Sequence, residues 1–215
     1  LNPDYIYERI CLGNFVGAKI SHVLKIPYIV EYNGSEISMR RSFDGVGYEN
    51  ESIYLLAEQV AFKQATVISV VSEAVRDDLL ARGVTPSKII VNPNGADPQM
   101  YSPPSSCEKA EIREELGFEP NDRVIGFTGT FGGWHGVDII AESLTSICAA
   151  SDSARFLMIG DGNYKYLIDE VVDKYSLQNK VVCTGRVPQV EGARYLKACD
   201  IFISPHSSDM VDSRF

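Results

Sequence analysis

The 215-residue sequence lacks the features of several common protein classes. It has no Cys-x-x-Cys pair, no run near the ~20 apolar residues that span a bilayer, and few cations. Twenty Lys and Arg oppose 29 Asp and Glu, so the net charge is −9. That sign excludes a general basic surface for nucleic acid or anionic membranes, and any phosphate site must be local.

The five cysteines lie far apart, and several, such as Cys183 and Cys199, stand in apolar runs. They predict reduced packing residues and therefore a cytosolic chain. The sequence begins at Leu1 without a Met or a signal peptide and ends in mid-loop at DMVDSRF. We therefore expect an internal piece of a larger protein.

Short β-branched runs alternate with amphipathic helical patterns, which is typical of right-handed βαβ units around parallel sheets. Ser72 is expected to cap one of these helices. The predicted class is doubly wound α/β, with near-continuously apolar strands covered on both faces. The expected strands are 27–32, 66–71, 88–91, 124–128, 155–159, 180–184 and 200–204. The expected helices are 14–24, 49–63, 73–82, 109–116, 137–149, 164–175 and 189–198.

The alternation breaks in residues 91–106, where four prolines and a glycine interrupt every amphipathic period. We place the domain boundary near Ser102. The sequence thus predicts two incomplete Rossmann-like domains, residues 1–101 and 102–215.

In open α/β sheets the ligand lies outside the carboxyl ends of the strands, so the loops that follow the strands are informative. Residues 129–136 (GTFGGWHG) precede a predicted helix, whose free N–H groups and positive dipole end suit a phosphate or diphosphate. A plain glycine-rich turn is an equally good interpretation of this loop alone. The candidate residues are Gly129, Thr130, Phe131, Gly132, Trp134, His135 and Gly136.

Three further loops lie at the same edge of the predicted sheet. Gly160-Asp161-Gly162 is by itself best interpreted as a turn. Arg186-Val187 could face a phosphate or a base, although a lone Arg is usually a solvated or ion-paired surface group. Pro205-His206 closes the last strand, which makes His206 a better ligand candidate than His22, a helix-face residue.

In the first half, Glu31, Asn33 and Glu36 gather at the end of strand 27–32, facing the expected interdomain cleft. Their carboxylates could orient sugar hydroxyls or serve as a base. Alternatively, they cap the next helix or pair with Arg40 or Arg41.

Five ordered passages resemble the family 4 retaining glycosyltransferases, which have the GT-B fold. They are ATVISVVSEAVRDDLLARGV, KIIVNPNGADPQMYSP, RVIGFTGTFGGWHGVDIIAESL, FLMIGDGNYKYL and VVCTGRVPQVEGARYLKACDIFISPH. The resemblance places residues 129–136 along a donor diphosphate and Arg186-Val187 near the base. It places Pro205-His206 near the donor sugar or phosphate.

Three departures from the family pattern stand out. Thr130 and His135 occupy places where members often have an Arg and a Lys, and Asn33 stands where many have a cleft His. The sequence also stops at Phe215, before the family's glutamate pair. The piece alone is therefore expected to be inactive.

The resemblance implies transfer of a hexose from a UDP- or GDP-sugar, with retention, to a glycan, lipid-linked or small-molecule acceptor. No metal-ligand spacing occurs, and no cofactor beyond the nucleotide-sugar co-substrate is expected. We expect no nucleic-acid partner. We expect a cytoplasmic location, with any contact at the inner membrane face made by regions outside this chain. Two rivals are a sugar-nucleotide epimerase of GT-B shape and a non-catalytic sugar-nucleotide-binding domain.

Overall fold

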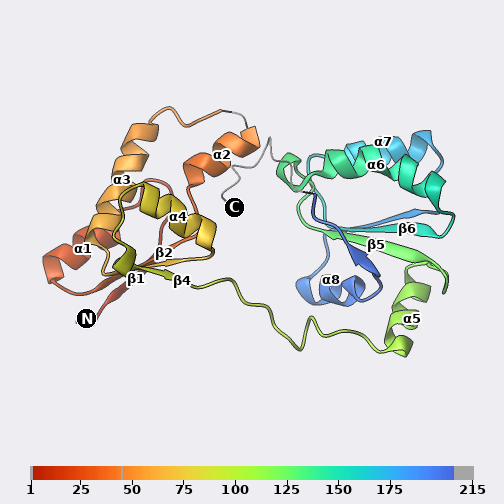
Figure 1. The fold of residues 1–215 in the computed structure, drawn as a ribbon, viewed down its shortest axis with the longest axis horizontal. Coiled ribbons are helices and arrows are strands. Elements are labelled where there is room, and N and C mark those ends of the chain that lie inside the picture. Colours follow the sequence, from red (N-terminus) through yellow and green to blue (C-terminus); the bar gives the residue numbers. More distant parts are fainter. Residues whose placement is uncertain (1, 45, 206–215) are drawn as a thin grey trace. The chain divides into compact units, whose positions relative to one another are not determined.

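The chain folds into two compact units (Figure 1). Residues 92–105, the joining segment, form no helix or strand. The computed structural model describes residues 2–44 and 46–205. The described parts of the first unit are residues 2–44 and 46–95, and the described part of the second unit is residues 96–205. The second unit therefore begins inside the proline-rich stretch in which the sequence predicts a boundary.

The first unit is a four-stranded parallel sheet in the order β1-β2-β3-β4. Its elements in chain order are β1 (Ile6–Arg9), α1 (Val16–Leu24), β2 (Tyr28–Tyr32), α2 (Glu36–Asp44), α3 (Glu51–Gln64), β3 (Val67–Val70), α4 (Glu73–Ala81), η1 (Pro86–Lys88) and β4 (Ile89–Val91). Ser72 caps α4 as expected, because its hydroxyl accepts a hydrogen bond from the Val75 N–H at 3.2 Å.

Helices α1, α3 and α4 share one hydrophobic cluster with one face of this sheet. Ile6 and Ile89 point into that cluster, so their neighbours Tyr7 and Ile90 point to the other face. Tyr7 is 56% exposed and Ile90 is 51% exposed. Among the described residues, this other face is thus open to solvent at the edge strands β1 and β4, whereas Ser69 on the central strand β3 is buried.

One strand and one α-helix of the first unit escaped the sequence analysis. Strand β1 alternates half-buried and exposed side chains, as an edge strand does, and its charged residues mask the apolar signal. Helix α2, with the sequence EISMRRSFD, carries too few apolar residues to show a helical period.

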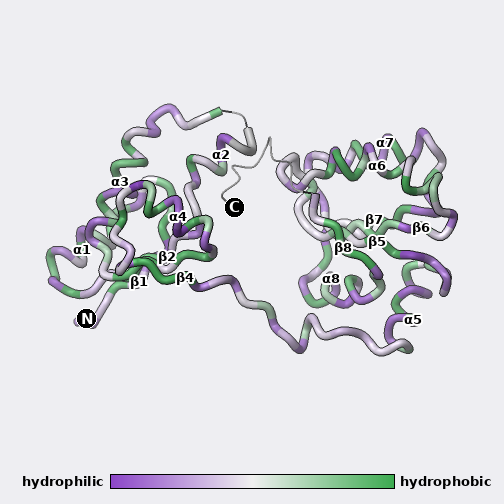
Figure 2. The backbone as a smooth tube through the Cα atoms, viewed as in Figure 1, coloured by the Kyte–Doolittle hydropathy of each residue, from purple (hydrophilic) through white to green (hydrophobic). Residues whose placement is uncertain are grey.

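The second unit is a parallel sheet in the order β7-β6-β5-β8. Its elements are α5 (Ser106–Glu115), β5 (Arg123–Thr128), η2 (Gly133–His135), α6 (Val137–Ala150), β6 (Ala154–Ile159), α7 (Lys165–Lys174), β7 (Val181–Gly185), α8 (Gln189–Leu196) and β8 (Ile201–Phe202). The hydrophobic segments of both units include their central strands (Figure 2).

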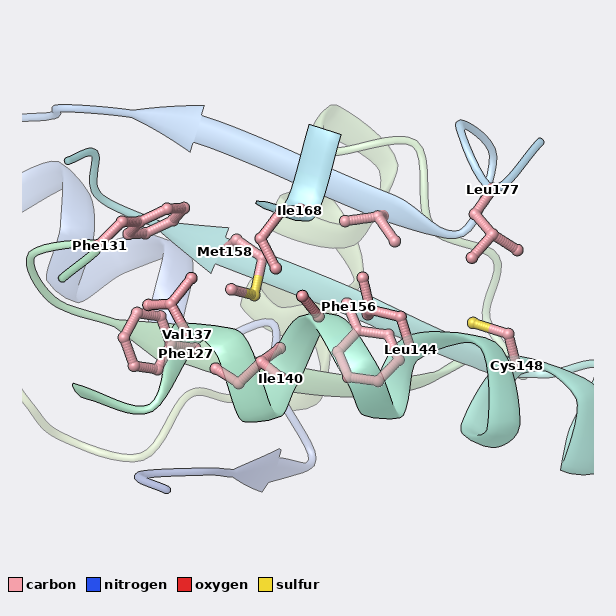
Figure 3. Packing of buried hydrophobic residues seen from close by; sticks show 12 residues of the cluster. Phe127, Phe131, Val137, Ile140, Leu144, Cys148, Phe156, Met158, Ile168 and Leu177 are labelled. Carbon is pink, nitrogen blue, oxygen red and sulfur yellow. The ribbon is translucent and has the colours of Figure 1, made fainter. Parts of the chain in front are cut away.

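Both faces of this second sheet are covered, as the sequence predicts. Phe156 and Met158 of β6 point into a cluster with α6 and α7, in which Leu144 is fully buried (Figure 3). Leu157 and Ile159 alternate with them and pack in a cluster with α5 and the end of α8. Alternate side chains of β6 thus contribute to two hydrophobic clusters, one on each face of the sheet.

The five cysteines are free thiols, but their environments differ. Cys148 and Cys199 are buried, and Cys183 is half-buried, in agreement with a packing role. Cys11 and Cys107 are exposed, so for these two the expected packing role is wrong. Within the described residues, no helix is both long enough and apolar enough to cross a bilayer.

Candidate functional site

The loops after β5 and β6 are joined to each other through their backbones at the carboxyl edge of the second sheet, and the loop after β6 is joined to the end of β7. The Phe131 N–H donates to the Asp161 carbonyl at 2.9 Å, and the Tyr164 N–H donates to the Phe131 carbonyl at 2.8 Å. The Gly160 N–H donates to the Gly185 carbonyl at 3.0 Å. These bonds fix the three loops as one surface.

Glycine is required where these loops touch. A Cβ at Gly160, where φ is +131°, would overlap the Gly129 carbonyl. A Cβ at Gly162 would lie 2.5 Å from the Phe131 carbonyl oxygen. The Gly160-Asp161-Gly162 sequence is therefore more than a turn, because it permits close backbone contact with the neighbouring loop.

The side chain of Phe131 packs the loop after β5 onto the hydrophobic core. Its side chain is fully buried, and its ring centroid lies 5.7 Å from that of Phe127 (Figure 3). Since its backbone N–H and carbonyl are both hydrogen-bonded within the joined loops, Phe131 stabilises the loop. We expect no ligand contact from its side chain.

A groove of about 380 Å³ lies over this edge of the sheet. It contains the predicted residues Gly129, Thr130, Gly160, Asp161, Arg186 and Val187. Its other lining residues are Tyr101, Thr128, Ile159, Pro188, Gln189, Gly192, Ala193 and Leu196. Three loops that the sequence analysis considered separately thus form one site.

The groove carries charges of both signs and adjoins one helix N-terminus. Arg186 is exposed and brings a positive charge, and the N-terminus of α8 begins close by at Pro188. Asp161 brings the opposing charge, but its Oδ1 accepts a hydrogen bond from the Gly162 N–H at 2.8 Å. This hydrogen bond holds the carboxylate against its own turn.

Trp134 and His135 lie in the same loop but outside the residues that line the groove. Their ring centroids are 4.3 Å apart, and the His135 ring also meets Phe127 edge-on at 6.2 Å. Gly132 and Gly162 likewise do not line the groove. These four residues support the loop in the arrangement that the structure describes.

Gly136 and Pro205 are brought together from distant parts of the sequence. Gly136 has φ +66°, and a Cβ there would overlap the Pro205 carbonyl. The segment after β8 therefore packs directly on the start of α6. His206, the other residue predicted at this place, lies outside the described residues.

In the first unit, Glu31 and Asn33 lie together. The Asn33 Nδ2 donates to Glu31 Oε1 at 3.3 Å, and the Tyr7 hydroxyl donates to Glu31 Oε2 at 2.7 Å. This bond to a carboxylate raises the pKa of Tyr7. Arg9 Nε lies 3.8 Å from the same carboxylate, so Glu31 belongs to a polar cluster.

Glu36 has a different environment. Its Oε2 accepts a hydrogen bond from the Leu12 N–H at 3.2 Å, so the carboxylate holds the loop that follows β1. Arg41 pairs with Glu51, with Nε and Oε1 3.0 Å apart. The structure thus brings together Glu31 and Asn33, and gives Glu36 a contact with a separate loop.

The sequence analysis missed one wall of the groove. Gln189, Gly192, Ala193 and Leu196 follow the i, i+3, i+4, i+7 spacing of one helix face, within a helix that was predicted. That spacing was the available signal. Tyr101, in the proline-rich stretch, carried no periodic signal and could be found only from coordinates.

Comparison with known families matches both units to glycosyltransferases. The profile described as "Glycosyltransferase Family 4" matches residues 3–100, and "Glycosyl transferases group 1" matches residues 108–210. HepE of Anabaena, solved in complex with UDP, has a TM-score of 0.76 and 20% identity over 94% of this chain and 53% of its own. The chain has the GT-B glycosyltransferase fold. The fold expected from the resemblance is confirmed.

Other proteins similar to this GT-B chain are also named as glycosyltransferases, and their sequence identity to it is low. TuaC of Bacillus subtilis, a putative teichuronic acid biosynthesis glycosyltransferase, is 24% identical over 97% of this chain and 49% of its own length. An uncharacterised glycosyltransferase of Methanocaldococcus jannaschii is 22% identical over 94% of this chain and 51% of its own length. The chain thus spans about half the length of these curated relatives.

Proposed function

We propose that the chain binds a nucleoside diphosphate sugar in the groove of the second unit, as part of a retaining glycosyltransferase. The observation that carries the proposal is the union of three loops into one surface, with Arg186 and the start of α8 at its side. The UDP complex of HepE, a protein of the same fold, supports this choice of ligand.

The chemistry of glycosyl transfer explains why such a surface is useful. The glycosidic bond stretches toward an oxocarbenium-like state while negative charge grows on the leaving diphosphate. A preorganised cation and helix dipole stabilise that charge without reorganising in the transition state. Arg186 is the residue of the groove that we assign to this role.

The proposed reaction transfers a hexose from a UDP- or GDP-sugar to a glycan, lipid-linked or small-molecule acceptor. Glu31 and Asn33, at the carboxyl end of β2, are our candidates for orienting sugar hydroxyls. We further propose that this chain is a portion of a longer enzyme, in keeping with its share of the relatives' length.

Binding is tested on the 215-residue chain with UDP and GDP, followed by the fluorescence of Trp134, its only tryptophan. Arg186→Ala should weaken binding about tenfold, the loss of roughly 1.4 kcal/mol that one charge-assisted contact supplies. The matched control is Arg123→Ala, at the opposite end of β5. Equal affinities for the two variants would refute the assigned role of Arg186.

Turnover is tested on the natural protein that carries this sequence. UDP-, GDP- and ADP-sugars are supplied with and without acceptors, and the products are identified. Transfer or donor hydrolysis supports the proposal. Interconversion of free sugar nucleotides without acceptor would indicate an epimerase, and binding without turnover would indicate a non-catalytic protein.

A further inference from the structure

Tyr101 is an exposed aromatic residue to which the proposed function assigns no role. It is 43% exposed and lies in the joining segment, within the second unit. Its hydroxyl accepts a hydrogen bond from Gln189 Nε2 at 3.3 Å, which fastens the segment to α8. Tyr101 therefore has a defined position at the groove.

Tyr101 contributes to the lining of two neighbouring hollows. It lines the groove of about 380 Å³ and also an adjoining apolar pocket of about 580 Å³. Thr128, Ala193 and Leu196 line both hollows as well. Tyr101 is the aromatic residue among those that line the groove, and its contact with Gln189 places it beside α8.

The face of α8 that also lines the groove includes two small residues. Gly192 and Ala193 have little or no side chain, and a Cβ at Gly192 would meet only Val187 and Ile159, at 3.6 and 3.7 Å. An aromatic ring beside small residues leaves room for a flat group. A planar heterocycle gains most from such a surface, because it can stack on the ring.

We infer that Tyr101 is the stacking wall for the nucleobase of the donor, an inference that depends on the proposed function. The base lies against the Tyr101 ring, and the diphosphate extends toward Gly129 and Thr130. Stacking tolerates any base, since every base has a π-face. Tyr101 therefore supplies affinity for nucleotides in general and does not choose between uracil and guanine.

The experiment compares three substitutions of Tyr101 in the 215-residue chain, with UDP and GDP as probes and Trp134 fluorescence as the readout. Tyr101→Phe keeps the ring and should bind both nucleotides within about threefold of the unmodified chain. Tyr101→Leu and Tyr101→Ala remove it and should weaken both by about 5-fold to 150-fold, the range measured for base–aromatic stacking. Tyr175→Ala, at an exposed tyrosine beyond α7, is the matched control and should bind normally.

Each other outcome has a definite meaning. The inference is overturned if Tyr101→Leu binds as well as Tyr101→Phe, or if Tyr101→Phe loses as much as Tyr101→Ala. Either result would show that bulk or the Gln189 contact matters and stacking does not. Failure of the unmodified chain to bind either nucleotide would instead contradict the proposed function itself.

Discussion

Replacing Asp200 with Asn should loosen α5 from the second sheet. Asp200 lies between α8 and β8, and its Oδ1 is 2.7 Å from Lys109 Nζ. Its Oδ2 is 2.6 Å from Arg113 Nη2 and accepts a hydrogen bond from the Val124 N–H at 2.9 Å. One carboxylate thus connects a helix and two strands.

The magnitude follows from the pKa of this group. Burial alone would raise the pKa of Asp200, but the hydrogen bonds from Lys109, the Val124 N–H and Arg113 lower it from 3.8 to about 2. A shift of that size would correspond to roughly 2.5 kcal/mol without screening. Because the carboxylate is partly open to solvent, we expect the variant to lose about 1–2 kcal/mol at pH 7.

The sign of the pH dependence follows from the lowered pKa. The ionised carboxylate stabilises the folded state above pH ~4, and this contribution is lost as the pH falls from ~4 through ~2. The difference in stability between the unmodified chain and Asp200→Asn should therefore shrink over the same interval. Both proteins should become equally stable near the lower end of it.

The assay is urea unfolding followed by Trp134 fluorescence, which reports on the second unit because that unit holds the only tryptophan. The control is Asp169→Asn, which removes an exposed pair with Lys165 and should cost less than about 0.5 kcal/mol. The reasoning is refuted if the two variants lose the same stability. It is also refuted if the Asp200 effect is constant between pH 7 and pH 2.

Two further predictions concern the second unit. Gly162→Ala should cost about 1–3 kcal/mol and weaken UDP binding, because the new Cβ meets the Phe131 backbone at 2.5 Å; unchanged stability and affinity would exclude this close contact. Leu144→Ala should cost about 3 kcal/mol in urea unfolding, because Leu144 is fully buried, whereas the partly exposed Ile139→Ala on the same helix should cost clearly less.

The architecture was predictable because its signals are local. Each strand of the second sheet is a short apolar run, and α6 shows helical spacing at Val137, Ile140 and Leu144. These patterns need no knowledge of distant contacts. Edge strand β1 and the polar helix α2 escaped because their residues are too polar to leave such a pattern.

The candidate site was predictable only in part. Glycine at the ends of β5, β6 and β7 indicates where a backbone can approach a ligand closely. The candidates Gly129, Gly160 and Arg186, which stand at those strand ends, all line the groove. Nothing in the sequence distinguishes Phe131 from the other residues of the glycine-rich loop. Only the packing in the structure shows that its side chain points into the core. Tyr101 joins the groove from a segment without periodicity, through a contact with Gln189 across the fold.

We propose that the joined loops after β5, β6 and β7 form the surface that holds the charged part of a sugar nucleotide. The most direct measurement is a crystal structure of the chain with bound UDP. We predict electron density for the diphosphate in the groove, within contact distance of Thr130 and Arg186. A nucleotide bound at any other surface of the chain would contradict the account.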